Sequence, residues 1–179
     1  MKKHPTIGCC GIDCGLCPRF YTEGISRCPG CGGEGFEKKH PPCSLKTCCI
    51  EKHGLEACGL CADYPCKRYE NREKTEKDSF VTHKRIYQNQ EIIKTDGIDR
   101  FLSIQTERIS ILDSMITGFD DGRSKSYFCL AAALLQIERL RISIDEAVGE
   151  KDKKNKTKAL KALLQEQADL SGIRLSLDK

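Results

Sequence analysis

Apolar residues recur at spacings of three and four along the second part of the chain, from about residue 79 onward. The clearest series occupies residues 98–118 and predicts an amphipathic helix with one buried face. Similar series predict further helices over 79–94, 124–148 and 157–170. Because a one-sided apolar face needs a surface to cover it, we expect these helices to pack on one another or on the rest of the chain. Residues 173–177 alternate apolar and polar positions, which predicts a short edge strand.

The first part of the chain, residues 1–70, shows no such periodicity and is punctuated by glycine, proline and cysteine. Twelve of the 13 cysteines lie between Cys9 and Cys66. Large apolar side chains are too few here to build an independent core, so we expect disulfides or metal ions to hold the segment together. The pattern predicts a small metal-stabilised, zinc-ribbon-like module over 1–70 and a helical region over 71–179 packed on it, mostly α with little β.

The spacing of the cysteines points to metal. Three Cys-x2-Cys turns stand at 14–17, 28–31 and 58–61, and Cys43-x4-Cys48 is a looser fourth pair. A turn of this kind brings two sulfurs close enough to share a metal ion at about 2.3 Å. The neighbouring glycines and prolines permit the tight loop and free backbone N–H groups to bond the sulfurs. Four pairs predict two Zn²⁺ sites, formed either by neighbouring pairs or by interleaved ones.

The remaining cysteines are interpreted individually. Cys10 and Cys66 are expected to supply further thiolates at the two ends of the module. Cys9 and Cys49 each adjoin another cysteine, and two adjacent side chains rarely point at one metal ion, so both are interpreted as packing or spare thiols. Cys129 lies outside the module on an apolar helix face and is predicted to be a buried core residue.

The kind of cross-link depends on the cellular compartment. Residues 1–13 carry two lysines but lack the apolar stretch of a secretory signal, so we expect a cytoplasmic protein whose thiols stay reduced. Thiolates alone also suit iron–sulfur clusters, and Cys10-x3-Cys14-x2-Cys17 has the spacing of the radical-SAM motif. The sequence lacks the alternating strands and helices of the barrel on which radical-SAM enzymes are built. The iron–sulfur alternative is therefore an electron-transfer or redox-sensing protein with a [4Fe–4S] cluster.

Closed four-thiolate sites leave no open coordination position, so the predicted zinc is structural. We interpret the protein as a binding module for a protein partner, with no known reaction, rather than as an enzyme. A net charge of +4 and an aromatic content of 6% favour nucleic acid less, and no apolar run is long enough to span a membrane. An enzyme using the thiolate of Cys10 or Cys66 beside an incompletely ligated metal is a third interpretation.

A candidate anion site lies outside the cysteines. Arg123, Ser124 and Lys125 place cations and backbone N–H groups at a predicted helix start. A turn with a helix cap explains the same residues more simply, because no phosphate-binding strand precedes them.

Four motifs together resemble the cysteine-rich domain-of-unknown-function family 3795 of bacteria and archaea: CCGIDCGLCP at 9–18, CPGC at 28–31, CSLKTC at 43–48 and EACGLCADYPC at 56–66. Residues 83–102 and 121–135 are also similar to members of this family. Its members are regarded as zinc-binding, with no reaction established, so the resemblance implies a zinc protein. The family's cysteines correspond here to Cys10, Cys14, Cys17, Cys28, Cys31, Cys43, Cys48, Cys58, Cys61 and Cys66. Many relatives carry another cysteine pair after the helix near residue 102, and this chain lacks it, which removes the basis for a third metal site there.

Overall fold

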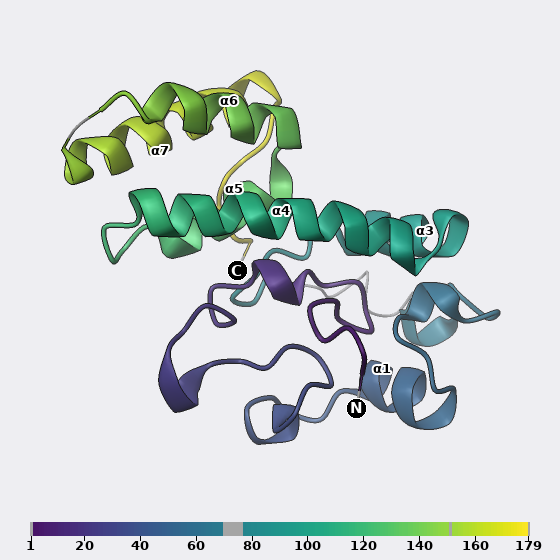
Figure 1. Cartoon of the computed structure of the whole chain (residues 1–179). Coiled ribbons are helices and arrows are strands. Elements are labelled where there is room, and N and C mark those ends of the chain that lie inside the picture. Colours follow the sequence, from purple (N-terminus) through teal and green to yellow (C-terminus); the bar gives the residue numbers. More distant parts are fainter. Residues whose placement is uncertain (1, 70–76, 151, 179) are drawn as a thin grey trace.

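The computed structural model describes residues 2–69, 77–150 and 152–178 and arranges them in three layers (Figure 1). The long helix α4 (Ile98–Phe119) crosses the middle of the molecule, and α5 (Lys125–Leu134) packs against it. Helices α6 (Ile137–Ala147) and α7 (Lys153–Leu170) cover one side of this middle layer. The cysteine-rich segment lies on the other side, against α4 and α3 (Ile86–Asp96). The mostly helical fold predicted from the sequence is confirmed.

The helices bury the apolar faces that the sequence predicted. Leu112 and Met115 of α4 have no exposed surface. They belong to one core cluster with Phe128 of α5, Leu140 of α6 and Leu164 of α7, which are equally buried. These side chains meet because each helix returns an apolar residue to the same face every three or four positions. A single core therefore joins α4 to α7.

The predicted helix over 124–148 is interrupted after α5 and continues as α6, because two arginines from elsewhere in the chain bind the carbonyls where α5 ends. Arg108 of α4 donates through Nη1 to the Ala132 and Leu135 carbonyl oxygens, at 2.5 and 2.8 Å. Arg85 donates to a third carbonyl of the same turn at 3.2 Å. The last carbonyls of a helix have no partner within it, and cations beside them are favourable. No glycine or proline marks the break, so the sequence pattern did not reveal it.

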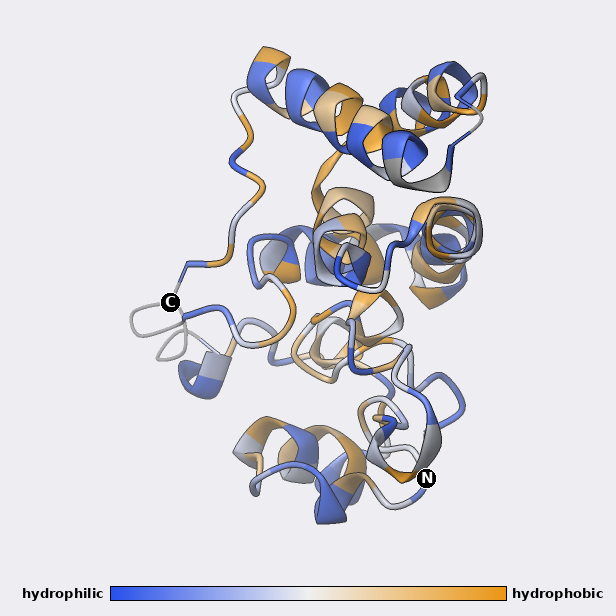
Figure 2. Ribbon diagram, turned by 90° about the vertical axis from the view of Figure 1, so that its left-hand side faces the viewer, coloured by the Kyte–Doolittle hydropathy of each residue, from blue (hydrophilic) through white to orange (hydrophobic). Residues whose placement is uncertain are grey.

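The first predicted helix begins at Ile86 rather than near residue 79. Asp78, which directly precedes the predicted range, pairs with the C-terminal tail rather than capping a helix there. Its N–H donates to the Asp178 carbonyl and its carboxylate accepts the Asp178 N–H, both at 2.8 Å. The tail runs past the middle layer to reach this point (Figure 2). The predicted edge strand over 173–177 is wrong, because the tail is irregular there and meets no strand among the described residues with which to form a ladder.

The cysteine-rich segment consists of loops and short helical turns. These turns include Cys14–Leu16, Cys58–Leu60, the α1 segment Ser44–Lys46 and a π-helical turn over Thr47–Lys52 that continues α1. Among the described residues, its β structure is one isolated bridge between Ile7 and Asp13. The hairpins of a zinc ribbon are not seen in the described segment, because most of its backbone hydrogen bonds close local turns instead.

A buried polar network docks this segment onto the helices. Asp13 is 6% exposed and accepts hydrogen bonds from Asn89 of α3 at 2.8 Å and from Gln105 of α4 at 2.9 Å. Gln90 of α3 donates to the Cys9 carbonyl at 2.8 Å. Buried polar groups are costly without partners, so these contacts determine how the cysteine loops lie on α3 and α4.

Candidate metal centre

Six of the predicted ligand cysteines line one cavity of about 440 Å³, which we call the large thiol cavity. Its cysteines are Cys10, Cys14, Cys17, Cys28, Cys31 and Cys43. His40 also lines the cavity, together with Arg19 and Phe80. The Arg19 guanidinium lies over the Phe80 ring, 4.8 Å from its centroid. Loops that are far apart in the sequence thus bring their sulfurs to the same space.

Backbone N–H groups point at two of these sulfurs. The backbone N–H groups of Arg19 and Phe20 favour the thiolate of Cys17 and so oppose the rise of its pKa. The backbone N–H group of Cys31 acts in the same way on the pKa of Cys14. Partners of this kind orient the ligands of a metal site and tune their basicity. The loops therefore present these sulfurs as polar groups with their own donors, rather than as apolar filling.

An imidazole stands beside the thiols. His40 Nε2 lies 3.2 Å from the Cys28 sulfur, and the His40 ring stacks on Phe36 with centroids 4.3 Å apart. Burial and the nearby Arg19 cation lower the pKa of His40. The ring is therefore neutral at pH 7, the form in which imidazole ligates a metal or donates a single N–H to a thiolate.

A second pocket, of about 30 Å³, lies among the remaining cysteines and is called the small thiol pocket. It is lined by Cys48, Cys49, His53, Leu55, Cys58, Cys61, Tyr64 and Cys66. Since a single water needs a cavity of at least about 10–15 Å³, this space suits one small ion and not a cluster. Four of the predicted ligands line it.

Burial makes the thiolate form of these cysteines costly. It raises the pKa of Cys14 well above its usual range, and the neighbouring sulfurs of Cys31 and Cys10 raise that pKa further. Burial also raises the pKa of Cys17, with Cys28 adding to the effect. A metal cation is the group that makes several neighbouring thiolates stable, because it offsets both desolvation and mutual repulsion.

The two groups follow chain order. The turns 14–17 and 28–31 share the large thiol cavity, whereas the turn 58–61 lies at the small thiol pocket. The looser pair is divided, with Cys43 at the first and Cys48 at the second. None of the cysteines is in a disulfide. Among the described residues, no three His, Cys, Asp or Glu side chains converge on one point at ligand distance.

Cys9 and Cys49, which the sequence analysis interpreted as packing or spare thiols, are both buried. Both lie in a buried cluster with Cys31 and Phe36. Cys9 does not line the large thiol cavity, although its neighbour Cys10 does. The side chains of adjacent residues point in different directions from an extended or turning backbone. The adjacency of two cysteines therefore predicts that they lie in different surroundings.

The candidate anion site has its N–H groups occupied within the chain. Asp120 accepts the Ser124 N–H and Asp121 accepts the Arg123 N–H, both at 3.0 Å. Lys125 donates to a backbone carbonyl of the cysteine-rich segment at 3.1 Å. The carboxylates of Asp120 and Asp121 therefore accept the N–H groups that the sequence analysis assigned to an external anion. Their negative charge also repels an anion.

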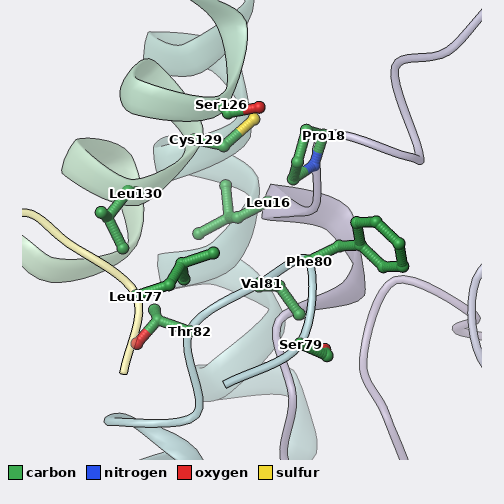
Figure 3. A pocket seen from close by; sticks show the side chains of 10 residues that line it. All are labelled: Leu16, Pro18, Ser79, Phe80, Val81, Thr82, Ser126, Cys129, Leu130 and Leu177. Carbon is green, nitrogen blue, oxygen red and sulfur yellow. The ribbon is translucent and has the colours of Figure 1, made fainter. Parts of the chain in front are cut away.

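A third cavity, of about 230 Å³, contains Cys129 (Figure 3). Leu16 and Pro18 line it from the cysteine-rich segment, and Leu177 lines it from the tail. Cys129 projects from α5 and is 2% exposed. Burial raises the pKa of its thiol. The prediction that Cys129 is a buried core residue is confirmed.

No family model, curated protein or solved structure matches the chain. The likeness to family 3795 therefore rests on the motifs quoted above. Within the described residues, no helix combines the length and apolarity needed to cross a bilayer.

Proposed function

We propose that the cysteine-rich segment binds Zn²⁺ through cysteine thiolates and that the metal is structural. The observation that carries this proposal is the gathering of six predicted ligand cysteines around the large thiol cavity. A donor set of thiolates with one imidazole suits zinc. The backbone N–H groups that favour the Cys17 and Cys14 thiolates are the kind of outer partner that such ligands need.

The donors are sufficient for more than one ion. A tetrahedral zinc site takes four ligands, and the large thiol cavity offers six thiols. The small thiol pocket offers Cys48, Cys58, Cys61 and Cys66, with His53 beside them. Closed sites of this kind cross-link loops and leave no open coordination position, so the protein's task is to present a surface to a protein partner.

One observation favours a second candidate. The large thiol cavity, at about 440 Å³, is far roomier than a single ion requires. Cys10, Cys14 and Cys17 line it together, and thiolates are the usual ligands of iron–sulfur clusters. A [4Fe–4S] cluster in this cavity would make the protein an electron-transfer or redox-sensing protein.

Elemental analysis and a visible spectrum of the anaerobically purified full-length protein separate the two candidates. The zinc proposal expects a colourless protein with about two or more zinc ions per chain, given four ligands per site. Iron with acid-labile sulfide and a brown colour would establish the second candidate instead. Protein that holds neither metal, even after reconstitution with Zn²⁺ or with iron and sulfide, overturns both.

A variant ties the metal to the cavity. The Cys14→Ser/Cys17→Ser/Cys28→Ser/Cys31→Ser protein is expected to lose at least one zinc ion, because it leaves only Cys10, Cys43 and His40 at this cavity and a site takes four ligands. Cys129→Ser is the matched control because its thiol lies in a separate cavity. Removal of zinc with a strong chelator should unfold the cysteine-rich segment and leave much of the helical circular dichroism. An unchanged zinc content in the quadruple variant would show that this cavity does not hold the metal.

A further inference from the structure

Three buried thiols and one half-buried thiol form a row between the large thiol cavity and the small thiol pocket. The buried ones belong to Cys9, Cys31 and Cys49, the half-buried one belongs to Cys58, and we call the four the thiol row. The Cys9 and Cys31 sulfurs lie 3.8 Å apart. The Cys49 thiol interacts with both the Cys9 and the Cys58 thiols. Cys9, Cys31 and Cys49 are 1%, 8% and 4% exposed, and Phe36 packs with them.

One sulfur–sulfur distance in this row equals the distance between two ligand sulfurs of a zinc site. Two ligand sulfurs at the corners of a tetrahedron with Zn–S bonds of about 2.3 Å stand about 3.8 Å apart. The Cys9 and Cys31 sulfurs are at that separation. The apolar surroundings exclude water, as a closed structural site requires. Among the described residues no three such side chains converge on one point, so ligation requires these side chains to rotate until the row closes into a tetrahedron.

A buried cation supplies an independent observation. Lys2 is 7% exposed, and its ammonium donates to the Ile7 carbonyl. Its positive charge acts on the thiols of Cys9, Cys31 and Cys49. Among the described residues, no carboxylate lies within ion-pair distance of this ammonium. A buried ammonium without a counter-charge is costly.

The backbone is shaped to bring Lys2 to this position. The Lys2 N–H donates to the Gly32 carbonyl at 3.2 Å. A Cβ at Gly32, whose φ is +70°, would lie 3.0 Å from the Lys2 side-chain carbons. Glycine therefore leaves the space through which the lysine stem reaches the thiols. Four thiolates around Zn²⁺ carry a net charge of −2, and this is the counter-charge that the ammonium lacks.

We propose that Cys9, Cys31, Cys49 and Cys58 bind a zinc ion of their own, with Lys2 as its charge-neutralising partner. The inference rests on the proposed function and adds a third site to it. Neither Cys9 nor Cys49 belongs to the ten cysteines that the sequence motifs assign to metal. The large thiol cavity can release Cys31, since five thiols remain there. The small thiol pocket can release Cys58, since Cys48, Cys61, Cys66 and His53 remain.

Metal counting on the full-length chain tests this site. Zinc-loaded wild-type protein is expected to hold about three ions, and the Cys9→Ser/Cys49→Ser variant about two, because each site takes four ligands. Cys129→Ser, the control for loss of a buried thiol, should retain all three. ¹¹³Cd NMR of the cadmium-loaded wild-type chain should give three resonances, and this measurement needs no variant that might misfold.

A second variant addresses the cation. Lys2→Met keeps the length of the side chain and removes its charge, and it should weaken zinc binding at one site about 10–100-fold, as loss of an outer partner does. Competition with a chromophoric chelator measures this change. Lys3→Met is the matched control, since Lys3 is exposed.

The outcomes separate this inference from the proposed function. Wild-type protein that binds no zinc overturns both. Two cadmium resonances, with zinc content unchanged in the Cys9→Ser/Cys49→Ser variant, overturn the third site and leave the proposed function standing. Mass spectrometry of protein purified under reducing conditions gives a further test. A mass 2 Da below that of the fully reduced chain, mapped to a Cys9–Cys31 disulfide, also overturns the third site, because those sulfurs would then be bonded to each other.

Discussion

The substitution Asp13→Asn tests whether the buried network couples the cysteine loops to the helices. Asp13 accepts the side-chain N–H groups of Asn89 and Gln105, at 2.8 and 2.9 Å. Its negative charge also acts on Arg85 and Arg108. Asparagine has nearly the same shape, so the change removes the charge and turns one acceptor into a donor that faces an amide donor.

The size of the effect follows from these contacts. A hydrogen bond to a charged group contributes about 1.5–3 kcal/mol, against about 0.5–1.5 kcal/mol for a neutral one. Two bonds are weakened, and one buried donor loses its acceptor. We therefore expect the free energy of unfolding to fall by about 2–4 kcal/mol. This is a large part of the roughly 5–15 kcal/mol that stabilises an ordinary domain.

Urea denaturation of the metal-loaded proteins, followed by circular dichroism at 222 nm, measures this free energy. Asp145→Asn is the matched control because Asp145 is an exposed carboxylate on α6, and it should change stability by no more than about 0.5 kcal/mol. If Asp13→Asn is as stable as Asp145→Asn, the network does not couple the two parts of the molecule, and the argument for docking through Asp13 fails.

Two further predictions concern the helix break and the thiols. Arg108→Met should lower the free energy of unfolding by about 2–4 kcal/mol, because two carbonyls lose a charged donor. The control is Arg141→Met, which removes only an exposed ion pair. In the same urea assay, this control should lower the free energy of unfolding by no more than about 1 kcal/mol. Zinc affinity should fall as pH falls from 8 to 6. The raised pKa values of Cys14 and Cys17 mean that both thiols are protonated when free, so ligation must release their protons, and acid opposes that release. Chelator competition at the two pH values measures this, and equal affinities would show that no thiol proton is displaced.

Helix positions followed closely from the sequence where the apolar period was long. The series over 98–118 became α4, which extends one residue further, and the series over 157–170 became the greater part of α7. Each pattern is local and repeats over several turns, so it identifies the helix and its buried face together. The start of α3 was predicted less accurately, because Asp78 forms a hydrogen bond with the distant Asp178 instead of capping a helix.

The metal-ligand candidates were visible in the sequence, but their grouping was not. The spacing of the cysteines and the neighbouring glycines and prolines identify the Cys-x2-Cys turns in the sequence. Which turns share a space depends on how the loops fold back. The separation of Cys43 from Cys48 arises from contacts between loops that no local pattern records.

The sequence by itself determined a core-poor, thiol-rich segment and a set of amphipathic helices, because composition and periodicity are properties of neighbouring residues. Only the tertiary structure decided where α5 ends, since the cations that bind its last carbonyls come from Arg85 and Arg108, far along the chain. Only the tertiary structure placed Lys2 beside three thiols. Folding of the backbone brings a buried charge and its partners together. The free-energy cost of such a charge depends on its burial in the folded chain, which the spacing of residues in the sequence does not reveal.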